Sequence, residues 1–202
     1  MGILAIGLVS LPVFVEAPLV RVAPSLCLVI SVLWLGLARL WRSPYGSLTW
    51  GFALTWLCGS VYWGWLRWFP EVHVPVEALA LPWAVWGIAH PSHRVGAWFY
   101  FGSLLGTGIT DFYFWVNDLF PHWQMLMGHE TDLGMMHLVL DQALLAVQSL
   151  RGILWAILLS LVLLSITYAC GRSPKLHHWV FGGAVLGTLL VDILFGLGAL
   201  SR

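Results

Sequence analysis

One apolar segment of this chain occurs twice. Trp98–Phe114 aligns without a gap with Trp179–Phe195, 81 residues later (179 minus 98), and Trp, Gly, Leu, Gly, Thr, Asp and Phe recur in register. Each copy has the apolar length of a membrane-crossing helix and carries one carboxylate deep inside it, Asp111 or Asp192. A carboxylate at the centre of such a helix costs on the order of 3 kcal/mol, so both acids need a structural or a functional reason. The repeat therefore predicts two equivalent membrane helices.

Composition extends this prediction to the whole chain. Apolar residues make up 60% of the 202 residues and charged residues only 9%. A water-soluble protein of this size could not bury so much apolar surface, so lipid must solvate most of it. We expect one integral membrane domain, 1–202, built as an all-α polytopic helix bundle. Its net charge of zero argues against nucleic acid as a partner. The predicted spans, about seven in all, are 2–20, 24–41, 48–68, 74–89, 96–119, 152–170 and 178–200.

The segment 133–150 is apolar in count, but it places His137, Asp141 and Gln148 on one helical face. Such a polar stripe suits an amphipathic helix that lies at the membrane interface, or one packed inside the bundle. If this helix does not span, the repeat helices 96–119 and 178–200 run in the same direction, as equivalent copies should. We therefore predict an interfacial amphipathic helix and a partial parallel internal repeat.

The distribution of positive charge predicts the orientation of the bundle. Alternate loops on one side are basic, whereas the loops on the other side combine arginines with acids. We expect the N-terminus and the short basic loops to face the cytoplasm. The loop 120–132 should then face the lumen or periplasm. The basic residues on the cytoplasmic side are Arg39, Arg42, Arg94, Arg172 and Lys175.

On each repeat helix the glycines and the aspartate point in different directions. Glycines spaced by four residues allow close helix contact, and a hydroxyl and a carboxylate share another face. One hypothesis is that both acids face a shared cavity and handle a proton, a cation or a cationic substrate group. The alternative is that they are structural acids, neutral or paired with arginine, that fix the helix register. The packing candidates are Gly102, Gly106, Gly183 and Gly187, and the substrate or ion pathway candidates are Asp111, Asp192, Thr107, Thr188 and Glu77.

Metal ligands and cofactor contacts have weaker support in the sequence. The histidines near the lumenal loop are seven and eight residues apart, which fits no zinc pattern, and a hydrated polar loop explains them as well. The aromatic run Tyr62–Trp68 could hold a pigment or a lipid, although an aromatic belt at the membrane boundary also accounts for it. We identify no catalytic residue, and the sequence favours a protein that is not an enzyme. The weak metal candidates are His122, His129, His137 and Asp141.

Three segments carry a family resemblance. Leu11–Arg21, Gly59–Trp68 and Gly102–Phe114 are similar to domain-of-unknown-function family 3120, an uncharacterised cyanobacterial integral membrane family. The similarity extends over nearly the whole chain and brings no chemistry or site residues with it. It implies a cyanobacterial thylakoid or plasma membrane and, by association, a role beside the photosynthetic apparatus.

These observations favour a non-catalytic accessory or assembly protein. Its small-residue faces and aromatic girdle would bind helices, pigment or lipid, with the bilayer and membrane proteins of photosynthetic complexes as partners. The alternative is a small transporter or substrate-binding membrane subunit that uses Asp111 and Asp192, and a metal-dependent membrane enzyme comes third. A transporter requires these acids in a polar cavity, an enzyme requires three converging ligands, and an accessory protein requires an exposed small-residue groove.

Overall fold

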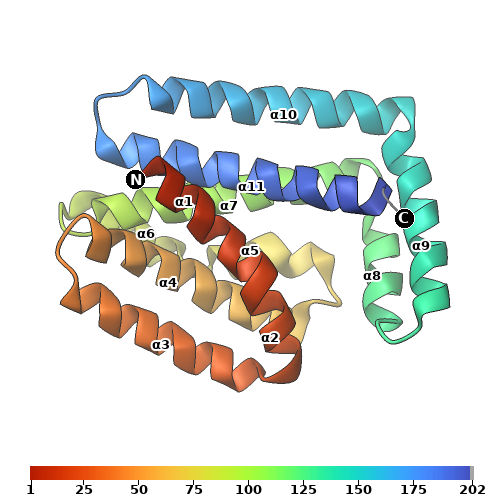
Figure 1. Ribbon diagram of the computed structural model, residues 1–202, viewed down its shortest axis with the longest axis horizontal. Coiled ribbons are helices and arrows are strands. Elements are labelled where there is room, and N and C mark those ends of the chain that lie inside the picture. The colour runs from red at the N-terminus through yellow and green to blue at the C-terminus, as the bar shows by residue number, and fades with distance from the viewer. Residues whose placement is uncertain (201–202) are drawn as a thin grey trace.

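The computed structural model describes residues 1–200, and every regular element in this range is a helix (Figure 1). The all-α prediction is therefore confirmed, and positions 201–202 of the predicted domain lie outside the described residues. The elements in chain order are α1 (Gly2–Leu11), η1 (Pro12–Glu16), α2 (Ala17–Val22), α3 (Pro24–Leu40), α4 (Tyr45–Val61), η2 (Tyr62–Leu66), η3 (Pro70–Val72), α5 (His73–Glu77), η4 (Ala78–Ala80), α6 (Leu81–Ala89), α7 (Arg94–Val116), α8 (Phe120–Gly128), α9 (Leu133–Gln148), α10 (Leu150–Gly171) and α11 (Leu176–Leu200).

Within residues 1–200, four helical stretches are long and apolar enough to cross a membrane. This supports a membrane helix bundle, because each stretch approaches or exceeds the roughly 20 residues that a span needs. The other predicted spans, among them those that form α3, α4 and α7, stay predictions. The four stretches are Gly2–Val22, Pro70–Ala89, Leu150–Gly171 and Leu176–Ala199.

The two repeat helices are neighbours at the centre of the bundle. Helices α7 and α11 pack against each other and run in the same direction (Figure 1). Helix α7 also contacts α4 and α6, while α11 contacts α1 and α10. The repeat therefore builds a central pair around which the other long helices are arranged.

Glycines lie where these helices approach most closely. A Cβ at Gly102 would lie 2.6 Å from the carbonyl oxygen of Phe181, and a Cβ at Gly187 would lie 3.1 Å from the Cα of Ile6. Without side chains at these positions, the helix backbones pack in direct contact. Gly187 was predicted as a packing residue, and the structure shows that its partner is α1 rather than the other repeat helix. Gly106 faces Thr188 and Gly183 faces Gly2.

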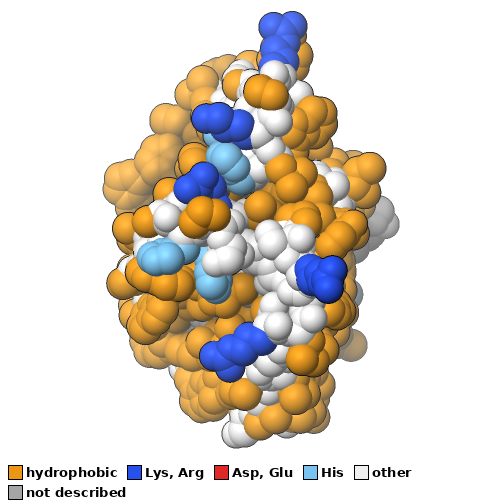
Figure 2. All heavy atoms as spheres, turned by 90° about the vertical axis from the view of Figure 1, so that its left-hand side faces the viewer, with side chains coloured by type: hydrophobic (Ala, Val, Ile, Leu, Met, Phe, Trp, Pro, Cys, Tyr) orange, Lys and Arg blue, Asp and Glu red, His pale blue; other side chains and the backbone are white. Residues whose placement is uncertain are grey.

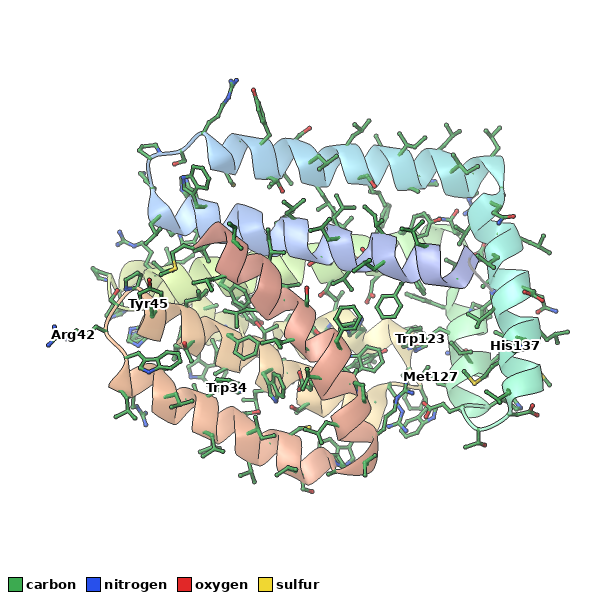
Figure 3. All side chains as sticks on the ribbon, viewed as in Figure 1. Trp34, Arg42, Tyr45, Trp123, Met127 and His137 are labelled. Atoms are coloured by element: carbon green, nitrogen blue, oxygen red, sulfur yellow. The ribbon has the colours of Figure 1, made fainter. Side chains whose placement is uncertain are left out.

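The predicted loop 120–132 contains the helix α8, whose start at Phe120 is followed by Pro121 in the first turn. Proline is tolerated at this position because its missing N–H would be unpaired there in any case. The indole Nε1 of Trp123 donates to the carbonyl oxygen of Arg67 at 2.8 Å, and Met127 is buried. Trp123 and Met127 lie near the bundle, where Figure 3 labels them. This hydrogen bond and the burial of Met127 attach the segment to the bundle, so it is not a hydrated loop.

Helix α9 is the predicted amphipathic helix, with its bounds at 133 and 148. Asp132 caps it, because its Oδ1 accepts a hydrogen bond from the backbone N–H of Met135 at 3.0 Å. The polar stripe faces outward, since His137 (labelled in Figure 3) and Asp141 are exposed. Both α8 and α9 lie across one end of the bundle rather than along it (Figure 1).

Several helices leave regular α geometry at the same end of the bundle. The segments Pro12–Glu16 and Tyr62–Leu66 are π-helical, and α5 is a five-residue helix between the 3₁₀ segments η3 and η4. Pro12 lacks a backbone N–H, which removes one donor from the helical ladder. Single-turn π segments often mark functional sites in α-helices. The polar side chains inside the bundle converge on these irregular turns.

Candidate functional site

His73 lies between two carboxyl groups. Its Nδ1 is 3.0 Å from Asp111 Oδ1 on α7, and its Nε2 is 3.4 Å from Glu77 Oε1, one turn later on α5. The Nδ1 contact is a hydrogen bond, and the Nε2 contact is at ion-pair distance. A neutral imidazole has one N–H, so pairing of both ring nitrogens with carboxyl oxygens takes two protons among the three groups. Two arrangements supply them: an imidazolium between two carboxylates, or a neutral imidazole beside one carboxylate and one carboxylic acid. Both arrangements carry a net charge of −1, and they differ only in which atoms hold the protons.

We call Asp111, His73 and Glu77 the triad. Neighbouring helices enclose it, and its side chains are 19%, 17% and 11% exposed, respectively. The Tyr62 ring stacks on the His73 imidazole with centroids 4.1 Å apart, and Thr107 Oγ1 lies 3.4 Å from Glu77 Oε2 as a donor. The triad is therefore a mostly buried polar site between η2, α5 and α7.

The second repeat aspartate is bound differently. Thr110 Oγ1 on α7 donates to Asp192 Oδ2 on α11 at 2.7 Å. Thr110 directly precedes Asp111, so one turn of α7 carries the first repeat acid and binds the second. Thr188 does not join this contact: its hydroxyl donates to the Ala184 carbonyl at 3.3 Å. The two sequence-equivalent acids thus have non-equivalent partners, a histidine for one and a threonine for the other.

A further acid lies on the other side of the triad. Glu16, at the end of η1, is fully buried, and its Oε1 contacts the hydroxyl of Ser60, which is also fully buried, on α4. Its Oε2 is buried without a hydrogen-bond partner. Glu16 and Glu77 are close enough to interact electrostatically. A polar layer therefore crosses the bundle from α11 through α7 and α5 to α4 and η1.

The arginines at this end of the bundle pair with other acids. Arg67 Nε is 3.1 Å from Glu130 Oε1, and Arg151 Nη1 is 3.4 Å from Asp118 Oδ2. Within residues 1–200, no lysine or arginine nitrogen lies within 4.0 Å of a carboxyl oxygen of any of the four embedded acids. Those acids are Glu16, Glu77, Asp111 and Asp192. The hypothesis that the embedded acids pair with arginine therefore does not describe their contacts, which are to histidine, serine and threonine.

The sequence candidates are only partly brought together. Asp111, Glu77 and Thr107 meet at the triad, whereas Asp192 binds the adjacent Thr110. His73 was missed because the predicted span began one residue after it. Its signal was present: His73 and Glu77 are four residues apart and share a face of any helix that includes both.

The metal candidates do not form a cluster. The ring of His122 faces the Asp118 carbonyl at 3.3 Å, and that of His129 faces the Met125 carbonyl at 2.9 Å. Over the described part of the chain, no group of three or more His, Cys, Asp or Glu side chains has an arrangement that could hold a metal ion. His122 and His129 thus contact backbone carbonyls four residues earlier in the chain.

The aromatic run Tyr62–Trp68 contacts other parts of the protein. Trp63 packs against Trp123 with centroids 5.5 Å apart, and Trp68 Nε1 donates to the Met127 carbonyl at 3.2 Å. The Arg67 guanidinium lies 4.0 Å above the Trp68 ring. These residues attach α8 to the bundle and cover the triad from that end.

The opposite end of the bundle is basic. Figure 2 views it directly and shows Lys, Arg and His side chains with no Asp or Glu on the visible face. Arg42 is labelled there in Figure 3. The His93 ring packs against Trp50 and Trp86, and partial burial together with the neighbouring His90 lowers its pKa. The basic end and the end that carries most of the acids therefore lie at opposite ends of the bundle.

Comparisons with known proteins identify one family. The family model described as "Protein of unknown function (DUF3120)" matches residues 5–200, which is nearly the whole chain. No curated protein matches the chain, and no solved structure matches it.

Proposed function

We propose that this chain, which belongs to the DUF3120 family, is a small proton-coupled membrane transporter whose proton site is the triad Asp111–His73–Glu77. The single observation that carries this proposal is the position of His73, with both ring nitrogens facing carboxyl groups inside an apolar bundle. A shared proton can move between these groups without a change in their net charge. Ionisable side chains placed this way in membrane proteins mark proton or substrate pathways.

The backbone around the triad supports the same function. His73 and Glu77 lie on α5, which interrupts the candidate span Pro70–Ala89 with 3₁₀ turns on both sides. Irregular backbone at membrane depth is tolerated where it is buried in protein or lines a cavity, and many transporters bind substrate at such broken helices. Tyr62 and the packed pair Trp63–Trp123 cover the triad, so this conformation is occluded. Movement of the short segments would give access to it.

The test is proton flux in reconstituted vesicles. Purified protein in liposomes with an internal pH dye is given an imposed potassium diffusion potential, and the rate of internal pH change is measured. We expect His73→Gln to reduce the protein-dependent rate at least tenfold, because glutamine cannot exchange a proton between the two acids. Asp141→Asn is the matched control, since Asp141 is an exposed acid on α9 that belongs to neither the triad nor the polar layer. It should keep the wild-type rate.

A proton-coupled carrier that moves only with its substrate would be silent in buffer alone, so the assay is also run with small cationic and neutral metabolites outside the vesicles. A wild-type rate equal to that of empty liposomes under both conditions would contradict the proposal. A His73→Gln rate equal to the wild-type rate would contradict it as well.

An accessory role is the second candidate, and the exposure of α10 favours it. Only 6% of the most apolar window of α10 is buried inside the protein, against 44% for α11. The exposed face of α10 could contact a partner helix as well as lipid. The predicted small-residue faces are already occupied, because Gly102 and Gly106 face α11 and Gly183 and Gly187 face α1. Stoichiometric co-purification of photosynthetic subunits, lost on polar substitution of the α10 face, would support this role.

We further propose seven spans in a cyanobacterial thylakoid or plasma membrane, with the N-terminus and the basic loops in the cytoplasm. The basic end shown in Figure 2 supports this orientation. The position of α8 and α9 across the other end supports an interfacial location for both helices, facing the lumen or periplasm.

A further inference from the structure

Glu16 is not part of the triad. It is the most deeply buried of the four embedded acids, with 0% of its surface exposed. It ends the π segment η1, and its partner Ser60 lies two residues before the π segment η2 begins. Two irregular turns from separate parts of the chain therefore meet at one carboxyl–hydroxyl contact. The proposed triad function does not use this contact.

The hydrogen atoms at this contact can be counted. Ser60 Oγ lies within hydrogen-bond distance of Glu16 Oε1 and also 2.9 Å from the carbonyl oxygen of Trp56. A serine hydroxyl has one hydrogen and cannot donate to both acceptors at once. If Glu16 is a carboxylic acid, it donates to Ser60 Oγ, and the serine hydrogen goes to the Trp56 carbonyl. One additional proton on Glu16 therefore satisfies both contacts.

The surroundings of Glu16 also favour the neutral acid. Its Oε2 has no hydrogen-bond partner and packs near Gly59, where a Cβ would lie 3.2 Å away. The titratable groups that face it are Glu77 from α5, Cys58 from α4 and Cys27 from α3, none of which supplies positive charge. An unpaired buried carboxylate costs several kcal/mol, whereas a neutral acid loses much less on burial.

A metal cation fits this position poorly. Hard cations such as calcium and magnesium take about six to eight oxygen ligands. The described contacts supply only the Glu16 carboxyl group, the Ser60 hydroxyl and the Trp56 carbonyl, which already accepts within its own helix. The proton is the one cation that needs no more than these partners.

We infer that Glu16 and Ser60 form a second proton-binding site, separate from the triad, in which Glu16 holds a proton as a neutral acid at neutral pH. The site stands next to Glu77, so loss of its proton would place a second negative charge beside the triad. A role of this site in coupling proton movement to transport rests on the proposed transport function. Proton binding by Glu16 does not depend on that function.

The test is infrared spectroscopy of the whole protein in phosphatidylcholine vesicles. At neutral pH we expect a protonated-carboxyl C=O band that shifts in D₂O, disappears on titration to alkaline pH and is lost in Glu16→Gln. Glu130→Gln is the matched control, because Glu130 pairs with Arg67 outside the buried layer. It should leave this band unchanged. A Glu16→Gln spectrum that keeps every protonated-carboxyl band of the wild type would overturn the inference.

Ser60→Ala decides the matter if Glu16→Gln cannot be purified. Removing the hydroxyl that accepts from the acid should shift the band to higher frequency without loss of intensity. An unchanged band in Ser60→Ala would also overturn the inference. Because no flux is measured, these outcomes are independent of the transport assay: a band without proton flux would support the site while contradicting the transport function.

Discussion

At the scale of single residues, the main finding is that equivalent residues of the repeat have different chemical surroundings. Asp111 contacts the His73 imidazole, whereas Asp192 accepts from the Thr110 hydroxyl. A histidine can exchange a proton with its acid near neutral pH, but a threonine hydroxyl cannot. The two acids are therefore not expected to contribute equally to function.

Asp111→Asn and Asp192→Asn should consequently differ. We expect Asp111→Asn to abolish proton flux, because an amide cannot hold the shared proton of the triad. Asp192→Asn should retain a measurable fraction of the wild-type rate, since its side chain can still accept from Thr110. Initial rates in proteoliposomes, normalised to the amount of inserted protein, measure the difference. Equal loss in both variants would instead indicate that the two acids act as one unit.

At the scale of helices, contacts without side chains hold the bundle together. Helices α4 and α7 approach so closely at Gly51 and Gly96 that a Cβ on either would overlap the backbone of the other helix. The Ser47 hydroxyl accepts from the Gly96 N–H at 3.0 Å at the same crossing. This crossing was not singled out from the sequence, because its glycines belong to different helices and neither forms a four-residue pair with another glycine.

Gly96→Ala should therefore destabilise the protein by about 1–3 kcal/mol, or prevent its folding, because the clash is with backbone that cannot rotate away. Gly108→Ala on the same helix is the matched comparison, since nothing lies within 4 Å of a Cβ there. It should be neutral or slightly stabilising, as alanine favours helix over glycine by up to about 1 kcal/mol. Thermal unfolding in detergent, followed by the fluorescence of the 14 tryptophans, distinguishes the variants. Equal melting temperatures for the two would contradict the close α4–α7 crossing.

Helix α9 offers a second test at this scale. Asp132→Ala removes the side chain that caps its first turn, which should cost about 1 kcal/mol of local stability. Hydrogen exchange of the α9 amides should accelerate several-fold, while the amides of α7 and α11 keep their protection. Asp141→Ala, on the exposed face of the same helix, should leave the exchange rates unchanged. An unaffected first turn in Asp132→Ala would show that packing on neighbouring helices, and not the cap, holds the start of α9.

At the scale of the whole molecule, charge is segregated between the two ends of the bundle. One end carries lysine, arginine and histidine without acids on its visible face (Figure 2). The other end carries Asp118, Glu130 and Asp132 in the turns beside α8 and α9, and Asp141 on α9. The polar layer lies towards the acid-rich end rather than at the middle. In the proposed orientation the triad is nearer to the lumen or periplasm than to the cytoplasm.

This orientation can be measured with single cysteines. Cys170 is replaced by serine, while the buried Cys27 and Cys58 remain. In right-side-out vesicles, a membrane-impermeant maleimide should label His129→Cys, on the turn after α8, and should leave Lys175→Cys, between α10 and α11, unlabelled until the membrane is opened. The reverse pattern would place the basic end outside, and labelling of both would contradict a single orientation.

Composition and segment length alone predicted the long apolar helices of this protein, because the apolar length of a segment is a local property. The parallel direction of the two repeat helices followed from the sequence only on the premise that 133–150 does not span. Only the tertiary structure showed that His73 lies between Glu77 and Asp111, or that Ser60 meets Glu16, 44 residues away. Such contacts depend on how separate helices cross, and those crossings are set by backbone approach at glycines such as Gly96 rather than by any pattern along one helix.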